Sequence, residues 1–140
     1  MDIQKTFPHI ESSKCRITSC ASQGYNCIAW AAGDDTRWWT TIPGGYYWPG
    51  SSRNQTIECL VALFTEMGYE ICTNAGLEVG FDKIALYGKD GEWQHASRQL
   101  ANGKWTSKLG NEEDIEHATP KDLSGNLYGR VHCIMKRAKL

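Results

Sequence analysis

The sequence has no long hydrophobic run, no marked excess of either charge sign and no leader-like N-terminus. None of its apolar stretches approaches the ~20 residues that a membrane-spanning helix needs. Fifteen Lys and Arg side chains face 16 Asp and Glu side chains, and no basic stripe concentrates the positive charge. The opening stretch, MDIQKTFPHIESSK, lacks the basic and then apolar segments of a secretory signal. These absences favour a cytoplasmic protein that binds neither membranes nor nucleic acid.

Paired cysteine motifs and nucleotide-binding motifs are also absent. The six cysteines, at positions 15, 20, 27, 59, 72 and 133, include no C-x-x-C pair and fit no common zinc-ligand spacing. Without a secretory signal, an even number of cysteines does not imply disulfide bonds. The sequence contains neither a phosphate-binding loop nor the glycine fingerprint of a dinucleotide site. We therefore expect a protein that needs no metal and no cofactor.

The apolar and charged fractions, 41% and 22%, are ordinary for a globular protein, and 140 residues suit a single domain. Two helices are predicted. The first runs over about residues 27–32, with Asn26 as its N-cap. The second, within NQTIECLVALFTEMG, has apolar residues at helical spacing, is capped by Ser52 or Asn54 and ends at Gly68.

Strands dominate the second half of the sequence. Asp90-Gly91 and Asn102-Gly103 are strong hairpin signals between strand-like segments. The predicted strands are YEICT, DKIALYG, EWQHASRQL, KWTSKLG and YGRVHCIMKR. N-terminal helices that pack on an antiparallel meander indicate an α+β fold. Residues 1–22 are polar and weakly patterned, and we expect them to be loosely structured.

The stretch GYNCIAWAAGD places Cys27 on the first turn of the first predicted helix. Free backbone N–H groups and the helix dipole stabilise an anion at this position. A thiol here is expected to have a lowered pKa, and its thiolate is the nucleophilic form of cysteine. The alternative is a cysteine that only fills the core, as we expect for cysteines 59, 72 and 133.

A cysteine nucleophile needs a base, and four histidines could supply one. His9 lies in the weakly patterned N-terminal segment, His117 follows an acidic loop, and His132 lies within the last predicted strand. His95 lies in the middle of a central strand, where a rigid element can hold an imidazole in place. We therefore predict that His95 is the base, although a strand histidine can also be purely structural.

The group that orients His95 depends on the turn at Asn102-Gly103. A two-residue turn pairs position 101 with 104, and Ser107 then points away from the face of His95. A three-residue turn with Gly103 in the left-handed conformation pairs 100 with 104 and 97 with 107, so that Ser107 shares this face. In this second register the Ser107 hydroxyl could orient the imidazole, as the third group of a triad does.

A cysteine on an early helix, a histidine on a later strand and a polar residue on the next strand resemble the order of papain-like enzymes. The layout is most similar to that of NlpC-type cell-wall peptidases, and HASRQLANGKWTS matches their histidine strand, turn and return strand. The sequence also resembles a family of uncharacterised bacterial domains with a YNCIAWA opening and an HA…W-x-SK-x-G continuation. The resemblance covers about residues 23–135. It implies one papain-like domain over 1–140, with Cys27 as nucleophile, His95 as base and Ser107 as the orienting residue.

The resemblance also suggests how an oxyanion would be held. Gln23 would contribute its side chain to the oxyanion hole, beside the backbone N–H of Cys27. Asp114 and Glu116 are the substitutes for Ser107 if the 110–117 loop folds back toward the histidine.

The resulting prediction is a cysteine-dependent peptidase or amidase that acts by acyl transfer on a peptide or amide substrate. Deamidation or transamidation would use the same machinery. By analogy alone, a bacterial effector or toxin with a protein target or inhibitor also fits a lone domain of this kind. The loop over 33–53, rich in Trp and Tyr, would form a substrate wall. The competing prediction is a non-catalytic module on a degenerate papain-like fold, whose aromatic loop binds a peptide or a partner protein.

Overall fold

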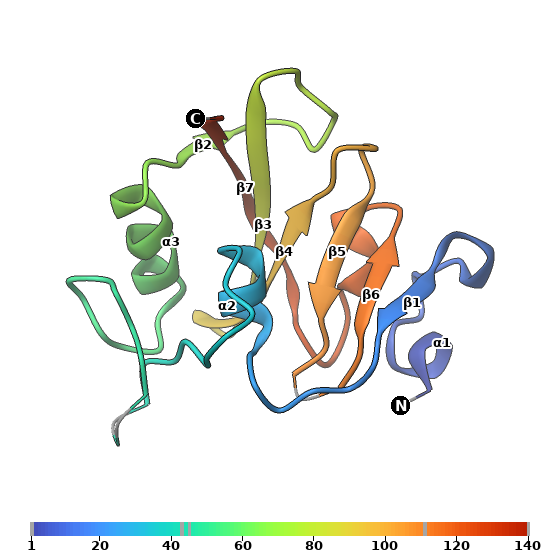
Figure 1. Ribbon diagram of the computed structural model, residues 1–140, viewed down its shortest axis with the longest axis horizontal. Coiled ribbons are helices and arrows are strands. Elements are labelled where there is room, and N and C mark those ends of the chain that lie inside the picture. Colours follow the sequence, from blue (N-terminus) through green and yellow to red (C-terminus); the bar gives the residue numbers. More distant parts are fainter. Residues whose placement is uncertain (1, 43, 45, 111, 140) are drawn as a thin grey trace.

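The computed structural model describes residues 2–42, 44, 46–110 and 112–139. These residues form a seven-stranded sheet and a few short helices (Figure 1). All the strand pairings are antiparallel, in the order β1-β6-β5-β4-β3-β7-β2. The elements are α1 (Ile3–Thr6), η1 (Ser12–Lys14), β1 (Arg16–Ser19), α2 (Cys27–Ala31), α3 (Ile57–Glu66), β2 (Glu70–Cys72), β3 (Phe81–Lys89), β4 (Glu92–Gln99), β5 (Trp105–Lys108), β6 (Asp114–His117), η2 (Pro120–Leu123) and β7 (Arg130–Ala138). The predicted α+β class is confirmed.

The meander of β3, β4 and β5 forms as predicted, because both connections carry residues that suit tight turns. Asp90 and Gly91 have φ angles of 54° and 80°, which is the backbone of a two-residue hairpin turn. Gly103 has a φ of 87°, and the Leu100 N–H donates to the Lys104 carbonyl at 2.7 Å to close a three-residue loop. β7 then pairs with β3, so the last strand lies inside the sheet.

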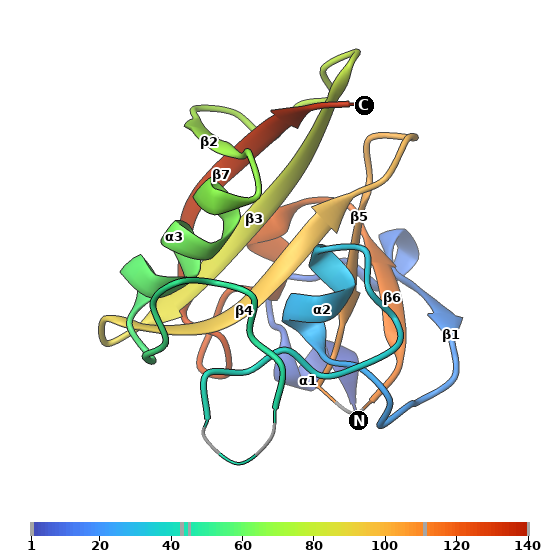
Figure 2. The same ribbon diagram turned by 60° about the vertical axis from the view of Figure 1, so that its left-hand side comes forward.

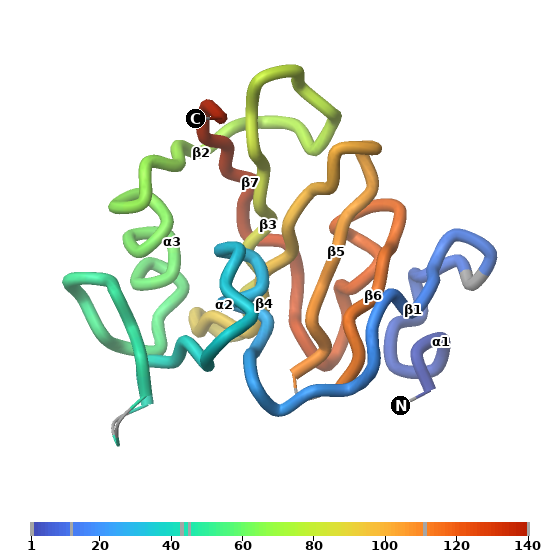
Figure 3. Tube along the Cα trace, viewed as in Figure 1, coloured from blue at the N-terminus to red at the C-terminus, as the bar shows by residue number. Residues whose placement is uncertain are grey.

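Both faces of the sheet are covered. Ile84 and Leu86 belong to a core that the sheet forms with α2 and α3, whereas Ala85 and Tyr87 belong to a second core. Because neighbouring residues of a strand point to opposite faces, the two cores lie on the two sides of the sheet. Figure 2 shows α2 and α3 together on one side. The described parts of the connection between these helices run past α2 and α3 in the tube view (Figure 3).

The prediction of a loosely structured segment over residues 1–22 is wrong. Phe7 and Ile10 are buried in the second core, and β1 forms an edge of the sheet beside β6. Two isolated apolar side chains do not produce a periodic pattern, but they order a segment when the tertiary structure offers them a surface. The acidic stretch that was expected to be a loop is likewise β6.

α3 begins at a different cap from those predicted. Thr56 is its N-cap, and its hydroxyl accepts the Cys59 N–H at 3.2 Å, whereas Ser52 and Asn54 lie before the helix. Gly68, with a φ of 97°, follows the C-cap and ends the helix as predicted. Among the described residues, the helices are too short or too polar to cross a membrane.

Candidate functional site

Cys27 is the first residue of α2, as the sequence predicts. Asn26 caps this helix, and its Oδ1 accepts the Ala29 N–H at 3.2 Å. Cys27 is 7% exposed and belongs to the core that α2 and α3 form on the sheet. A substrate can therefore reach the thiol only when part of this cover moves.

Three backbone N–H groups face the Cys27 sulfur. They belong to Cys27 itself, to Ile28 and to Ala96 of β4, and each of them favours the thiolate. Burial outweighs these groups and the nearby Lys108 ammonium, and it raises the pKa of the Cys27 thiol to about 11. The expected lowering of this pKa is therefore wrong, because lost hydration disfavours the anion more than the helix-start donors favour it.

The contact with Ala96 places the Cys27 thiol next to the strand that carries His95. The ladder between β4 and β5 ends at the pair Arg98 and Thr106, and Ala96 lies beyond this end. The Ala96 N–H there is close enough to the sulfur to favour its thiolate. The predicted nucleophile thus lies at the backbone of the residue that directly follows the predicted base. Because neighbouring residues of a strand point to opposite faces, the His95 ring itself leaves β4 on the other side of the sheet, toward Tyr87 and Tyr128.

His95 is fully buried, and neither of its ring nitrogens has a hydrogen-bond partner among the described residues. Burial, together with the nearby His117, holds the pKa of this imidazole well below its usual range. The ring is therefore neutral at neutral pH and keeps one nitrogen as a free proton acceptor. The groups that contact the ring are aromatic, since Tyr128 stacks on it and Tyr87 meets it edge-on.

Ser107 lies in the register that the three-residue turn predicts. The pairs Arg98↔Thr106 and Gln99↔Trp105 align Ser107 with Ser97, and the two hydroxyl oxygens lie 2.7 Å apart. The two-residue alternative is thereby excluded.

The expected bond from Ser107 to His95 is not formed, because Ser107 is engaged with a different histidine. Its Oγ lies 2.8 Å from His117 Nε2, and His117 Nδ1–H donates to the Thr119 carbonyl at 2.8 Å. Burial lowers the pKa of His117 to about 4, so the ring is neutral and its Nε2 accepts from Ser107. Ser107 therefore belongs to a buried hydrogen-bonded chain between β4, β5 and β6.

The two alternative carboxylates are also engaged away from the imidazole. Asp114 Oδ2 accepts from the hydroxyls of Ser19 and Tyr25 at 2.5 and 2.6 Å. Glu116 forms an ion pair with Arg16 at 2.7 Å. In this structure neither carboxylate orients the predicted base.

His117 is a buried residue of β6, although the sequence predicts a loop over this stretch. The acidic composition around it suggests a loop, yet Ile115 and His117 occupy alternate positions of β6 and are both fully buried. The alternation of Ile115 and His117 with acidic residues is the local signal of a strand. Asp114 and Glu116 mask this signal because they make the stretch look like an acidic loop.

The aromatic loop is attached to the start of α2. Asn26 Nδ2 donates to the Trp39 carbonyl at 2.8 Å, and Asn26 Oδ1 accepts the Trp39 N–H at 3.1 Å. The Trp38 Nε1–H donates to the backbone carbonyl of Gln23 at 2.6 Å, while Gln23 itself is exposed. The oxyanion role of the Gln23 side chain and the substrate-wall role of the loop both stay predictions.

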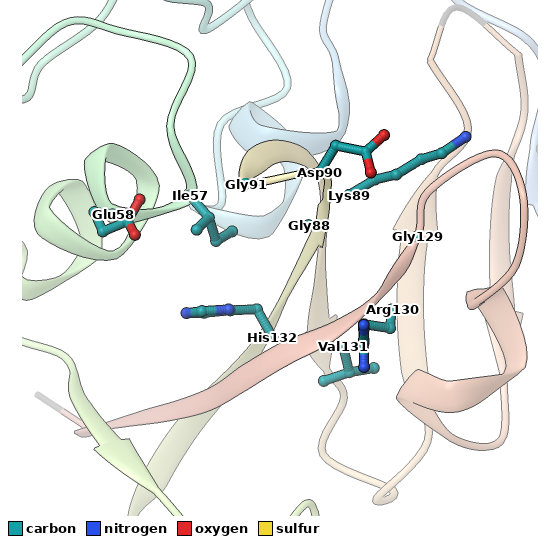
Figure 4. Close-up of a pocket in the computed structure, with 10 residues that line it drawn as sticks. All are labelled: Ile57, Glu58, Gly88, Lys89, Asp90, Gly91, Gly129, Arg130, Val131 and His132. Atoms are coloured by element: carbon teal, nitrogen blue, oxygen red, sulfur yellow. The ribbon is translucent and has the colours of Figure 1, made fainter.

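Two cavities lie away from these residues. One of about 680 Å³ is formed by the start of α3, the turn between β3 and β4 and the start of β7, and His132 lines it (Figure 4). Another of about 290 Å³ lies between α1 and β1. Neither is lined by Cys27 or His95. Within the described part of the chain, no three His, Cys, Asp or Glu side chains are grouped so that they could hold a metal ion.

Fold and site together define an antiparallel α+β protein with a helix-start cysteine in the core on one face of the sheet and a buried, unpartnered strand histidine whose ring packs on Tyr87 and Tyr128 of the other core. The chain belongs to the family described as "Domain of unknown function (DUF7689)", which matches residues 16–136. No curated protein and no solved structure matches the chain.

Proposed function

We propose that this protein is a cysteine-dependent hydrolase of peptide or amide bonds, with Cys27 and His95 in a papain-like, NlpC-type arrangement. The observation that carries the proposal is the fully buried His95 imidazole without a hydrogen-bond partner among the described residues. An unpartnered buried polar group costs about 1–3 kcal/mol, so it needs a specific explanation, and a catalytic role is one. A free proton acceptor on the strand whose backbone meets the Cys27 thiol supports such a role.

The pair would react from its neutral form. His95 takes the thiol proton as the Cys27 sulfur attacks the carbonyl carbon, and backbone N–H groups at the helix start stabilise the oxyanion. The imidazolium then protonates the leaving amine, so that the C–N bond breaks and a thioester remains on Cys27. Water attacks the thioester with His95 again as base, which releases the acid and restores the thiol.

The pH dependence of Cys27 alkylation by chloroacetamide tests the pairing without a known substrate. Transfer of the proton from Cys27 to His95 does not change the number of bound protons, so the thiolate–imidazolium fraction is independent of pH between the two pKa values. The thiolate beside a neutral imidazole adds a reaction that grows with pH below the Cys27 pKa of about 11, so we expect the wild-type rate to level off toward pH 6 instead of falling further. In His95→Phe, which fills the space without a nitrogen, the rate should rise about tenfold per pH unit.

Turnover on a panel of peptides and amides provides the second measurement. Cys27→Ala and His95→Phe should each lose at least about 10³-fold in kcat/KM, and the double variant should be little worse, since both residues act as one unit. Circular dichroism checks the fold. Full turnover by folded Cys27→Ala contradicts the proposal, as does a crystal structure with the sulfur more than about 8 Å from both His95 nitrogens.

A non-catalytic binding module is the second candidate. The observation that favours it is the covered Cys27 thiol, whose pKa of about 11 leaves it protonated at neutral pH. In that case Cys27 alkylation should rise with pH in the wild type just as in His95→Phe, and the panel should show no turnover.

A further inference from the structure

Lys108 ends β5 on the face of the sheet that α2 covers. The register between β4 and β5 brings Lys108 beside Ala96, the residue whose N–H lies close to the Cys27 sulfur. Thr106 precedes Lys108 by two residues and therefore shares its face, and its hydroxyl accepts the Trp30 Nε1–H of α2 at 3.0 Å. Lys108 and the Cys27 thiol thus lie on one face of the sheet, at the same point along β4.

The Lys108 side chain is fully buried, and its charge has no carboxylate partner. Its Nζ donates to the backbone carbonyls of Gly110, at 2.9 Å, and of Glu112, and it lies 5.3 Å from the centre of the Tyr25 ring. Among the described residues, no Asp or Glu forms an ion pair with it. A buried ammonium without an anion beside it is costly, because carbonyl dipoles replace only part of its hydration. Such a cation marks a place where an anion forms or binds.

Asp114 is the cross-strand partner of Lys108, yet its carboxylate serves other groups. Its Oδ2 accepts from the hydroxyls of Ser19 and Tyr25, and its buried Oδ1 has no hydrogen-bond partner among the described residues. Burial lowers the pKa of Lys108, and the charges of Asp114 and then of Cys27 raise it. The two anions that act most strongly on the ammonium are therefore this carboxylate and the Cys27 thiolate.

We propose that Lys108 is the counter-ion of the Cys27 thiolate. The inference rests on the proposed function, in which Cys27 is the nucleophile, and it adds a positive charge on the face of the sheet that carries the sulfur. When the thiol loses its proton, the ammonium stabilises the buried anion, because opposite charges attract strongly where little water screens them. The same charge attracts a negatively charged group that approaches the sulfur.

Two alkylating reagents of different charge test the counter-ion in the full chain. Iodoacetamide is neutral and iodoacetate is an anion, so the ratio of their rates at Cys27, measured by mass spectrometry of its peptide, reports the electrostatic potential at the sulfur. Lys108→Met removes the charge. At pH 7.5 its iodoacetamide rate should fall at least about tenfold, and its ratio of iodoacetate to iodoacetamide at least about threefold. Loosened packing alone would act in the opposite direction, because it uncovers the thiol and speeds both reactions.

Lys108→Arg and Lys104→Met are the matched variants. Lys108→Arg keeps the charge, and Lys104→Met removes an exposed one from the turn before β5, so both should keep the ratio within about twofold of the wild type. An unchanged ratio in folded Lys108→Met overturns the inference, as does a threefold fall in either matched variant.

The wild type supplies a test for which no variant has to fold. Cys20 is exposed and serves as the reference thiol within the same chain. A buried thiol without a cation disfavours an anionic reagent, whereas Lys108 should make the ratio of iodoacetate to iodoacetamide higher at Cys27 than at Cys20. An equal or lower ratio at Cys27 overturns the inference. Failure of the proposed function is a different result, namely wild-type alkylation that keeps falling toward pH 6 just as in His95→Phe.

Discussion

His95 and His117 are both buried imidazoles, but their ring nitrogens are in opposite situations. His117 is bonded on both sides, to the Ser107 hydroxyl and to the Thr119 carbonyl, and it links β6 to β5. The nitrogens of His95 have no such partners among the described residues. A satisfied imidazole supports the fold, whereas an unsatisfied one lowers its stability. This contrast supports a structural role for His117, and it is the observation on which the proposed role of His95 rests.

At the residue scale, Ser107→Ala should act on stability. The substitution leaves His117 Nε2 and Ser97 Oγ buried with one partner fewer, which should lower the free energy of unfolding by about 1–3 kcal/mol. Urea unfolding at pH 7 measures the loss. Ser13→Ala, at an exposed serine, is the control and should stay within about 0.5 kcal/mol of the wild type. Equal stabilities of the two variants would disprove the role of the buried chain.

At the scale of elements, α2 is too short to be stable by itself. It has five residues, whereas isolated helices below about 12–15 residues are marginal in water. Its cap and its packing on β4 and β5 therefore maintain it. Asn26 serves both the helix and the aromatic loop, since the same side chain bonds Ala29 and the backbone of Trp39. One residue thus couples the position of Cys27 to the loop beside it.

Asn26→Ala should consequently cost more than the loss of an ordinary cap. Thr56→Ala removes the cap of α3 and should lower the free energy of unfolding by about 1 kcal/mol. Asn26→Ala also removes the partners of the Trp39 N–H and carbonyl, so we expect a loss of roughly 2–4 kcal/mol. Chemical unfolding of both variants decides the comparison. Similar losses in both would show that the aromatic loop does not depend on Asn26.

At the scale of the whole molecule, coverage of both sheet faces removes water from titratable groups on the central strands. Burial lowers the pKa of His95 and His117 and raises that of Cys27. In each case the neutral form is favoured in the folded chain. The folded protein therefore resists charging these groups, and its stability depends on pH.

Acid should destabilise the protein below about pH 6.5. In that range the unfolded chain binds protons at His95 and His117 that the folded chain does not bind, so the free energy of unfolding falls as the pH falls. The shift of His117 from 6.5 to about 4 corresponds to roughly 3 kcal/mol, lost between these two values. Urea unfolding from pH 7 to 4.5 measures the slope.

His117→Gln is the matched variant for this measurement, because an amide bonds in the same place and does not titrate. Its stability should fall less steeply with acid than that of the wild type, by up to about 1.4 kcal/mol per pH unit. The exposed His9→Gln should keep the wild-type slope. A wild-type stability that does not change between pH 6.5 and 4.5 would contradict the burial of both imidazoles.

The sequence by itself determined the features that depend on neighbours within a few residues. Asp90-Gly91 and Gly103 set the two hairpin turns of the meander through their own φ angles, and Asn26 capped α2 through its own side chain. The helix-start position of Cys27 and the strand position of His95 followed from the same local patterns. Such signals are readable because the interactions that produce them are local in the chain.

Only the tertiary structure decided the conformation of the N-terminal segment, the formation of β6 and the surroundings of the candidate site residues. Phe7 is ordered by a core that residues far along the chain complete, and His117 finds Ser107 across a strand pair. The raised pKa of Cys27 and the unpartnered nitrogens of His95 also depend on segments that are distant in the chain. Desolvation and ring stacking are set by whichever groups fill the space around a side chain, and those groups come from segments that only folding brings together.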